Sequence, residues 1–205
     1  MARNECEGLR EWSAMSETGL LPAYLNLAIT ESADSSFPSK IKFYTDGITQ
    51  LTGHFALVEP INIYDDQSGV NIYCGVIVMI LIILYLLDQE LRLSERVAKL
   101  LLTGLLALSM NFNMLNYIWH GFHNQYGIPN RFVFLYIFLL LIMAYEVYLK
   151  RKQIRLYMVV VGYALSMVFV IFCYYNAEVT YANRTYIWTA ILLTVYVVLF
   201  SLYVR

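Results

Sequence analysis

The sequence has little charge and few cysteines. Lys and Arg together number 14 and Asp and Glu 15, giving a net charge of -1, so no basic surplus is present to bind nucleic acid. Glycine-rich phosphate loops and the His-Glu-x-x-His motif are missing, which argues against the common nucleotide sites and one class of metalloprotease. Cys6, Cys74 and Cys173 suggest no disulfide framework. We expect Cys74 and Cys173 to be buried thiols, with a disulfide between them as the alternative.

Apolar residues, in contrast, are abundant. They make up 60% of the 205 residues, which excludes an ordinary soluble domain and a disordered chain. Five apolar runs are long enough to cross a hydrocarbon layer of roughly 30 Å. The sequence therefore predicts an all-α integral membrane protein with about five transmembrane helices. Residues 1–66 form an extracytoplasmic N-terminal region and loop, and residues 67–205 form a single membrane domain. The runs are 67–87, 100–119, 132–149, 156–177 and 185–204.

Basic residues concentrate in alternate loops, after the first and the third apolar run. Because basic short loops favour the cytoplasm, we expect a multi-pass protein of the cell membrane with its N terminus outside and its C terminus inside. Glu146, near the end of the third run, is the only charged residue within a run. Its spacing predicts a pair with Lys150, one helical turn later, at the membrane surface, and the alternative is a buried functional carboxylate. The basic loop residues are Arg92, Arg96, Lys99, Lys150, Arg151, Lys152 and Arg155, against Arg131 and Arg184 in the other loops.

The N-terminal segment is at odds with this topology. Residues 1–19 are polar and contain no secretory signal, although the loop charges place them outside. We therefore expect that spans are missing upstream and that the chain is a fragment. The apolar run 20–29 is too short to span, and it is interpreted as the stub of a longer segment or as a helix lying on the membrane surface.

A polar motif follows the second run. Asn113, Asn116, His120 and His123 recur at spacings of three and four, which predicts one face of a helix that continues beyond the run. Such a face either binds a ligand or forms hydrogen bonds with neighbouring helices.

Aromatic and basic side chains accompany this motif. Trp119, Tyr117 and Tyr126 are expected to form an interfacial aromatic belt or to stack on a sugar ring. Arg131 begins the third run on the side where the charge bias disfavours arginine. A lipid phosphate would explain it, because the guanidinium matches a phosphate; the alternative is an arginine that reaches any headgroup.

The sequence indicates no cofactor, although a bound divalent metal ion is one possibility. A metal held by His120 and His123 needs carboxylate ligands, for which Asp65 and Asp66 are the candidates. The same adjacent pair is also a candidate acid or base, or simply a solvated loop end. Catalytic residues therefore stay unassigned.

The residues 112–122, followed by Pro129, Arg131 and Phe132, resemble the signature of the bacterial YfhO membrane-protein family. Residues 71–75 and 20–22 share the resemblance. It implies part of a GT-C glycosyltransferase bundle, which takes a sugar from a polyprenyl-phosphate carrier at the outer face of the membrane. In Gram-positive bacteria such proteins are linked to glycosylation of lipoteichoic acid or related surface polymers.

The resemblance also implies a binding site, and in one respect this chain differs from the pattern of GT-C enzymes. Arg131 would bind the lipid phosphate, and the face formed by Asn113, Asn116, Trp119, His120 and His123 would bind the sugar or the acceptor polymer. GT-C enzymes carry their catalytic acid in a first outer loop, which this chain begins after, so enzymatic activity is left open. The alternative is a non-catalytic membrane protein that binds or moves a polyprenyl-linked sugar or assists a partner transferase. Membrane lipid is a partner in either case, and nucleic acid is not.

Overall fold

The computed structural model describes residues 36–59, 70–88, 90–124, 130–178 and 181–204. The expectations for residues 1–35, Cys6, Asp65, Asp66 and Tyr126 lie outside this part. Every named element within it is helical, as the apolar runs predict. The elements are α2 (Gly47–Thr52), α3 (Ile77–Leu87), α4 (Leu93–Asn111), α5 (Asn113–Trp119), α6 (Val133–Leu149), the 3-10 helix η1 (Arg151–Gln153), α7 (Leu156–Asn176) and α8 (Asn183–Val204).

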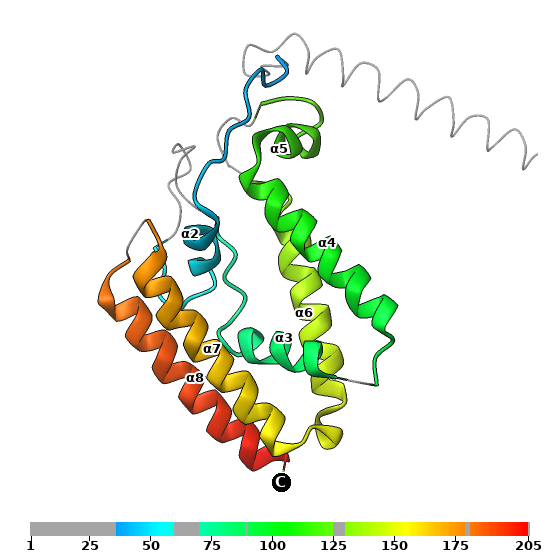
Figure 1. Cartoon of the computed structure of the whole chain (residues 1–205), viewed down its shortest axis with the longest axis vertical. Helices are drawn as coiled ribbons and strands as arrows, with labels where there is room; N and C mark the ends of the chain where they lie inside the picture. The colour runs from blue at the N-terminus through cyan, green and yellow to red at the C-terminus, as the bar shows by residue number, and fades with distance from the viewer. Residues whose placement is uncertain (1–35, 60–69, 89, 125–129, 179–180, 205) are drawn as a thin grey trace, which may run out of the picture.

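The long helices form two antiparallel pairs. Helix α7 lies beside α8, and α4 lies beside α6 (Figure 1). The shorter α3 lies across the space between the pairs and packs on both α6 and α7. Its fully buried Leu84 and Tyr85 meet a core to which Met143 of α6 and Val159 of α7 contribute. The core of the molecule therefore sits where α3 joins the two pairs.

Helices α7 and α8 have the character of membrane spans. Leu156–Asn176, with 21 residues, and Asn183–Leu202, with 20, each contain a stretch of 18 residues whose mean hydropathy is 2.4 and 1.9, respectively. Large apolar side chains remain exposed along both, including Val168, Phe172 and Leu199. Apolar surface of this extent is unfavourable in water and favourable in lipid. Helix α6, with 17 residues, is at the lower limit of spanning length.

The first apolar run differs from its prediction. Among the described residues of this run, 70–87, only Ile77–Leu87 forms a helix, and its 11 residues extend about 16 Å, half of the hydrocarbon thickness. The described residues before it are not helical and enter the helix through Gly75, whose φ is +104°. This backbone conformation suits glycine because it has no Cβ. The run therefore does not cross the membrane as one helix.

The second run is also interrupted. Helix α4 ends at Asn111 and α5 begins at Asn113, because Phe112 adopts an extended conformation (φ -96°, ψ 115°). Phe112 forms an antiparallel bridge with Phe43. The backbone groups of residues 111 and 113 exchange hydrogen bonds with Tyr44 and Lys42 over 3.0 and 3.1 Å. A segment some 70 residues earlier in the chain is thus hydrogen-bonded to the break between the two helices.

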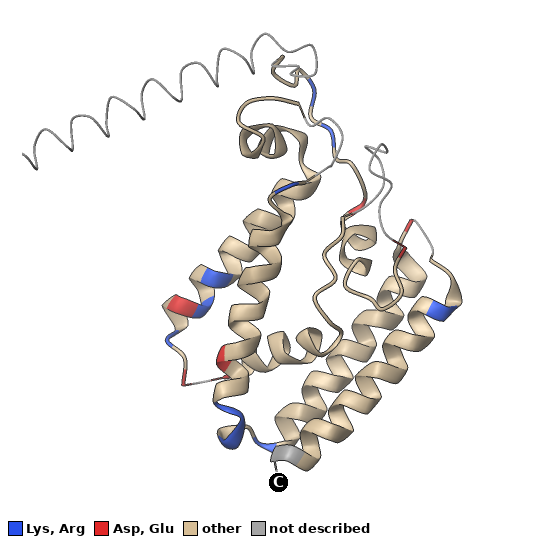
Figure 2. Cartoon of the chain, turned by 180° about the vertical axis from the view of Figure 1, so that it is seen from behind, with Lys and Arg blue, Asp and Glu red and all other residues tan. Residues whose placement is uncertain are grey.

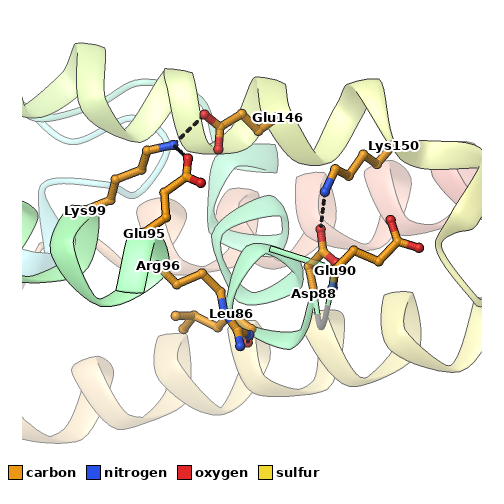
Figure 3. Close-up of polar contacts among 8 residues, drawn as sticks. All are labelled: Leu86, Asp88, Glu90, Glu95, Arg96, Lys99, Glu146 and Lys150. Atoms are coloured by element: carbon orange, nitrogen blue, oxygen red, sulfur yellow. Dashed lines mark hydrogen bonds and ion pairs between the residues drawn. The ribbon is translucent and has the colours of Figure 1, made fainter. Parts of the chain in front are cut away.

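The charged residues near the end of α6 and the start of α4 do not pair as predicted (Figure 3). Glu146 accepts a hydrogen bond from Lys99 of α4 over 2.5 Å, and Lys99 also donates to Glu95 over 2.9 Å. Lys150 pairs instead with Asp88 at the end of α3, over 3.4 Å. The prediction of a Glu146–Lys150 pair is therefore wrong, because neighbouring helices offer each residue a closer partner than its own helix does.

Cys74 and Cys173 are free thiols, and Cys173 is buried. The expectation of free thiols is confirmed for both, and that of burial for Cys173 only, because Cys74 is partly exposed.

Candidate functional site

The polar motif lies at the end of the molecule opposite the C terminus, where α5 meets the turn before α6 (Figure 2). Four side chains from these two segments form what we call the polar cluster: Asn116, His120, Asn130 and Arg131. The rings of Trp119 and Phe132 border it. The basic residues of 150–155 lie at the other end, beside the C terminus (Figure 2).

Asn116 ties the two segments together. Its side chain is 1% exposed, and Nδ2 donates to Oδ1 of Asn130 over 2.5 Å. Asn130 has a φ of +52°, a left-handed conformation that asparagine tolerates better than most residues. The Oδ1 atom of Asn116 is shielded from solvent and has no hydrogen-bond partner among the described residues. Within the described part of the chain, the cluster therefore contains one buried acceptor without a hydrogen bond.

His120 supplies a second buried acceptor. Its Nδ1 lies 2.8 Å from the carbonyl oxygen of Asn116. A carbonyl only accepts, so Nδ1 carries the proton, and Nε2 of the neutral ring is an acceptor. Nε2 is also shielded and lacks a partner in the described part of the chain. Burial lowers the pKa of His120, and the positive charge of Arg131 lowers it further, so the ring stays neutral near pH 7.

Arg131 lies exposed two residues before α6. No ion pair or hydrogen bond joins its guanidinium to a described residue, although its charge acts on His120. Arg184 is the contrasting case, because its Nη2 lies 3.4 Å from a carboxylate oxygen of Glu59. Arg131 is thus a cation without a counter-ion in this part of the chain, and its planar donors match a phosphate.

The aromatic rings hold α5 against the start of α6. Trp119 stacks on Phe132 with ring centroids 5.2 Å apart and an angle of 20° between planes. His120 meets Phe132 edge-on, with centroids 5.9 Å apart. Trp119 remains 42% exposed, so the stack leaves much of its surface uncovered. Ring contacts of this type orient the polar residues between them.

The predicted polar face is divided in the structure. Asn113 has a structural role, because Oδ1 accepts from the backbone of Lys42 over 3.1 Å and Nδ2 donates to the carbonyl of Lys40 over 2.8 Å. The prediction of one continuous face is wrong for His123, because α5 ends at Trp119. The Nδ1 atom of His123 lies 2.8 Å from the carbonyl oxygen of Gly121, within its own turn. Asn116 and His120 remain together.

Sequence reasoning missed two asparagines. Asn130 completes the cluster. In the sequence it is marked only by its position between Pro129 and Arg131, at the start of the third apolar run. Asn111 accepts from the backbone N–H of Thr45 over 2.8 Å and donates to its carbonyl over 2.7 Å. Together with Asn113, it fixes residues 40–45 at the junction between α4 and α5.

A metal site gains no support from the described residues. No group of three or more His, Cys, Asp or Glu side chains gathers among them. One ring nitrogen of each motif histidine bonds a backbone carbonyl instead.

One of three comparisons with known proteins found a match, and it agrees with the resemblance. No curated protein and no solved structure matches the chain. A family model described as bacterial membrane protein YfhO matches residues 13–205, which include all of α2 to α8 and the polar cluster. The chain therefore belongs to the YfhO family of bacterial membrane proteins.

Proposed function

We propose that this protein transfers a sugar from a polyprenyl-phosphate carrier to a cell-surface polymer such as lipoteichoic acid, and that the polar cluster binds the sugar phosphate. One observation carries the proposal: Arg131, without a counter-ion among the described residues, lies in the same cluster as two buried acceptors that lack partners. A phosphate needs a cation, and sugar hydroxyl groups need acceptors. The cluster offers both.

The energetics favour a hydroxylated ligand. A buried polar atom without a partner costs roughly 1–3 kcal/mol, and native proteins rarely leave one unexplained. Sugar hydroxyls that donate to Asn116 Oδ1 and His120 Nε2 would remove this cost. The uncovered surface of Trp119 suits the apolar face of a sugar ring. The neutral state of His120 matters, because a protonated Nε2 would donate rather than accept.

The proposed orientation places this cluster on the extracytoplasmic side. The basic residues of 150–155 and the C terminus lie together at the opposite end, as a cytoplasmic face requires (Figure 2). A polyprenyl-phosphate sugar presented at the outer surface would then meet Arg131 at the headgroup level. No nucleotide-sugar site is needed for such a donor.

Substitution of Arg131 tests the binding role. A charge-assisted bond to phosphate contributes about 1.5–3 kcal/mol, so Arg131→Ala should weaken carrier binding by about ten- to a hundredfold. Arg131→Lys should restore part of it, because lysine keeps the charge and loses the two-pronged geometry. The measurement is carrier affinity in one detergent. Arg184→Ala is the matched control, since this arginine already has a carboxylate partner. Equal losses at both arginines would refute the assignment.

A second assay separates catalysis from binding alone. Proteoliposomes containing the full chain, a radiolabelled polyprenyl-phosphate sugar and lipoteichoic acid should give labelled polymer, and Arg131→Ala should reduce the yield. Carrier binding without sugar release or transfer would instead support a non-catalytic protein that binds or moves the carrier or assists a partner transferase. That outcome would overturn the proposed reaction and leave the binding site in place.

A further inference from the structure

A second site lies away from the polar cluster, between the helix pairs. It is a cavity of about 340 Å³ lined by residues of α3, α4, α6 and α7 and by His54. Its volume falls in the range of about 300–1,000 Å³ that small-molecule sites occupy. The apolar lining includes Val78, Met79, Ile82, Ile83, Leu140 and Phe169.

The lining excludes a charged ligand. None of the described residues that line it is a Lys, Arg, Asp or Glu. The hydroxyl groups of Thr103 and Ser166 are already used, because they donate to backbone carbonyls of their own helices over 2.7 and 2.8 Å. A buried charge without a partner is strongly unfavourable. The occupant of most of this cavity is therefore hydrocarbon.

One polar pair lies in the lining. His54 Nε2 and the hydroxyl oxygen of Tyr136 are 2.9 Å apart. If the ring donates through Nε2, the tyrosine hydroxyl proton is free. If the tyrosine donates, the neutral ring carries its proton on Nδ1. In either arrangement the pair keeps one proton to donate, and burial holds the pKa of His54 at about 4, so the pair is uncharged at neutral pH.

The position along α6 fits a lipid. Tyr136 is the fourth residue of the helix, about one turn or 5 Å from its first residue. Leu140 lies one turn deeper. In a bilayer, ester carbonyls lie at the boundary between headgroups and hydrocarbon, and the acyl chains extend inward from them. The cavity has the same order, with a polar donor near the end of the helix and apolar side chains further in.

We propose that this cavity binds one acyl chain of a phospholipid, whose ester carbonyl accepts a hydrogen bond from the His54–Tyr136 pair. An isoprenoid carrier fits less well, because its chain has no carbonyl and its first polar group is an anionic phosphate. The two neutral side chains supply no charge to compensate it. This site does not depend on the function proposed for the polar cluster.

Photocrosslinking tests occupancy. The full chain in nanodiscs is irradiated with a phospholipid that carries a diazirine in one acyl chain, and adducts are mapped by mass spectrometry. Adducts on Met79, Ile82 and Leu140 are expected, and Met79→Trp, which fills the cavity, should reduce those on Leu140 at least fivefold. Leu101→Trp, at an exposed position of α4, is the matched control and should leave them unchanged. Equal labelling of Leu140 in wild type and Met79→Trp would overturn the proposal.

A second measurement does not depend on filling the cavity. Ester-linked and ether-linked phospholipids of the same chain length differ mainly in the carbonyl. Since a neutral hydrogen bond contributes about 0.5–1.5 kcal/mol, wild type should prefer the ester lipid by about two- to tenfold. The double variant His54→Phe, Tyr136→Phe should lose the preference. Equal binding of both lipids by wild type, or displacement of the ester lipid by equimolar polyprenyl phosphate, would contradict the assignment to an acyl chain.

Discussion

Two histidines of this protein lie in surroundings that disfavour their charged form. Burial lowers the pKa of His120 and that of His54, the latter to about 4. Each ring has one nitrogen within hydrogen-bond distance of a neutral oxygen, the Asn116 carbonyl or the Tyr136 hydroxyl. Protonation therefore disturbs both sites: it removes an acceptor at His120 and places a charge in an apolar cavity at His54.

The stability of the protein should consequently depend on pH. In the unfolded chain His54 has its ordinary pKa of about 6.5, so between pH 6.5 and 4 the unfolded state binds more protons than the folded state. The contribution of neutral His54 to the free energy of unfolding is fully present above pH 6.5. It decreases as the pH falls toward 4, by up to about 3 kcal/mol. Thermal unfolding in detergent at pH 7.5, 5.5 and 4.5 should show a steadily lower transition temperature.

His54→Phe should flatten this pH dependence, because it removes the titrating ring. His123→Gln is the control, since that ring bonds only a carbonyl of its own turn. The same slope in wild type and His54→Phe would show that other groups cause the acid sensitivity.

At this scale the sequence predicted part of the site. The spacing of three and four between Asn113, Asn116 and His120 indicates neighbours on a helix. It does not indicate that Asn113 is engaged by the backbone at residues 40 and 42, because these lie more than 70 residues away in the sequence. The role of Asn130 depends equally on a contact across a turn.

At the scale of the elements, apolar runs predict helices better than they predict where helices end. Hydropathy adds up side-chain transfer energies, and neither Gly75 nor Phe112 lowers that sum enough to mark a break. The break at Phe112 comes from its bridge to Phe43, which is a tertiary contact. The one before α3 comes from a backbone conformation that a hydropathy profile does not contain.

The contact between α4 and α6 should depend on Lys99. Its side chain and that of Glu146 are 20% and 28% exposed, between the exposed and buried classes of ion pair. Lys99→Met leaves the Glu146 carboxylate without its cation and should lower the free energy of unfolding by about 1–3 kcal/mol. Glu146→Gln should cost less, because Lys99 keeps Glu95 as a partner. Chemical unfolding in mixed micelles measures both.

The double variant Lys99→Met, Glu146→Gln should be no less stable than Lys99→Met alone, since no uncompensated carboxylate remains on α6. The exposed pair of Arg184 and Glu59 provides the comparison, and its coupling energy should be close to zero. A coupling between Lys99 and Glu146 as small as that one would show that the pair does not hold α4 to α6.

For the whole molecule, composition predicts a helical membrane protein, and the family match supports it. Which helices pack against one another was not predictable from composition, because it depends on how the side chains of their surfaces fit together. Gly162 illustrates this: a Cβ placed there would lie 3.3 Å from Cγ2 of Ile80, so α3 and α7 approach closely at this point. A glycine within an apolar run does not reveal which helix it faces.

Orientation can be tested on the intact molecule. Single cysteines replace Asn124 or Lys152 in a background where Cys6, Cys74 and Cys173 are alanine. A membrane-impermeant maleimide applied to whole cells should label position 124, because the charge distribution places it outside. Position 152 should react only after permeabilisation. The reverse pattern would move the polar cluster to the cytoplasm and remove the basis for an outer-face carrier site.

The unequal lengths of the helices bear on the membrane itself. Helix α8 extends about 33 Å over 22 residues and α6 about 25 Å over 17. A bilayer that matches one mismatches the other by several ångströms, and each ångström costs a fraction of a kcal/mol in tilt or lipid deformation. The boundary lipid should therefore be thinner beside α4 and α6 than beside α7 and α8. We therefore expect the protein to deform its surrounding bilayer asymmetrically, with the thin side next to the polar cluster.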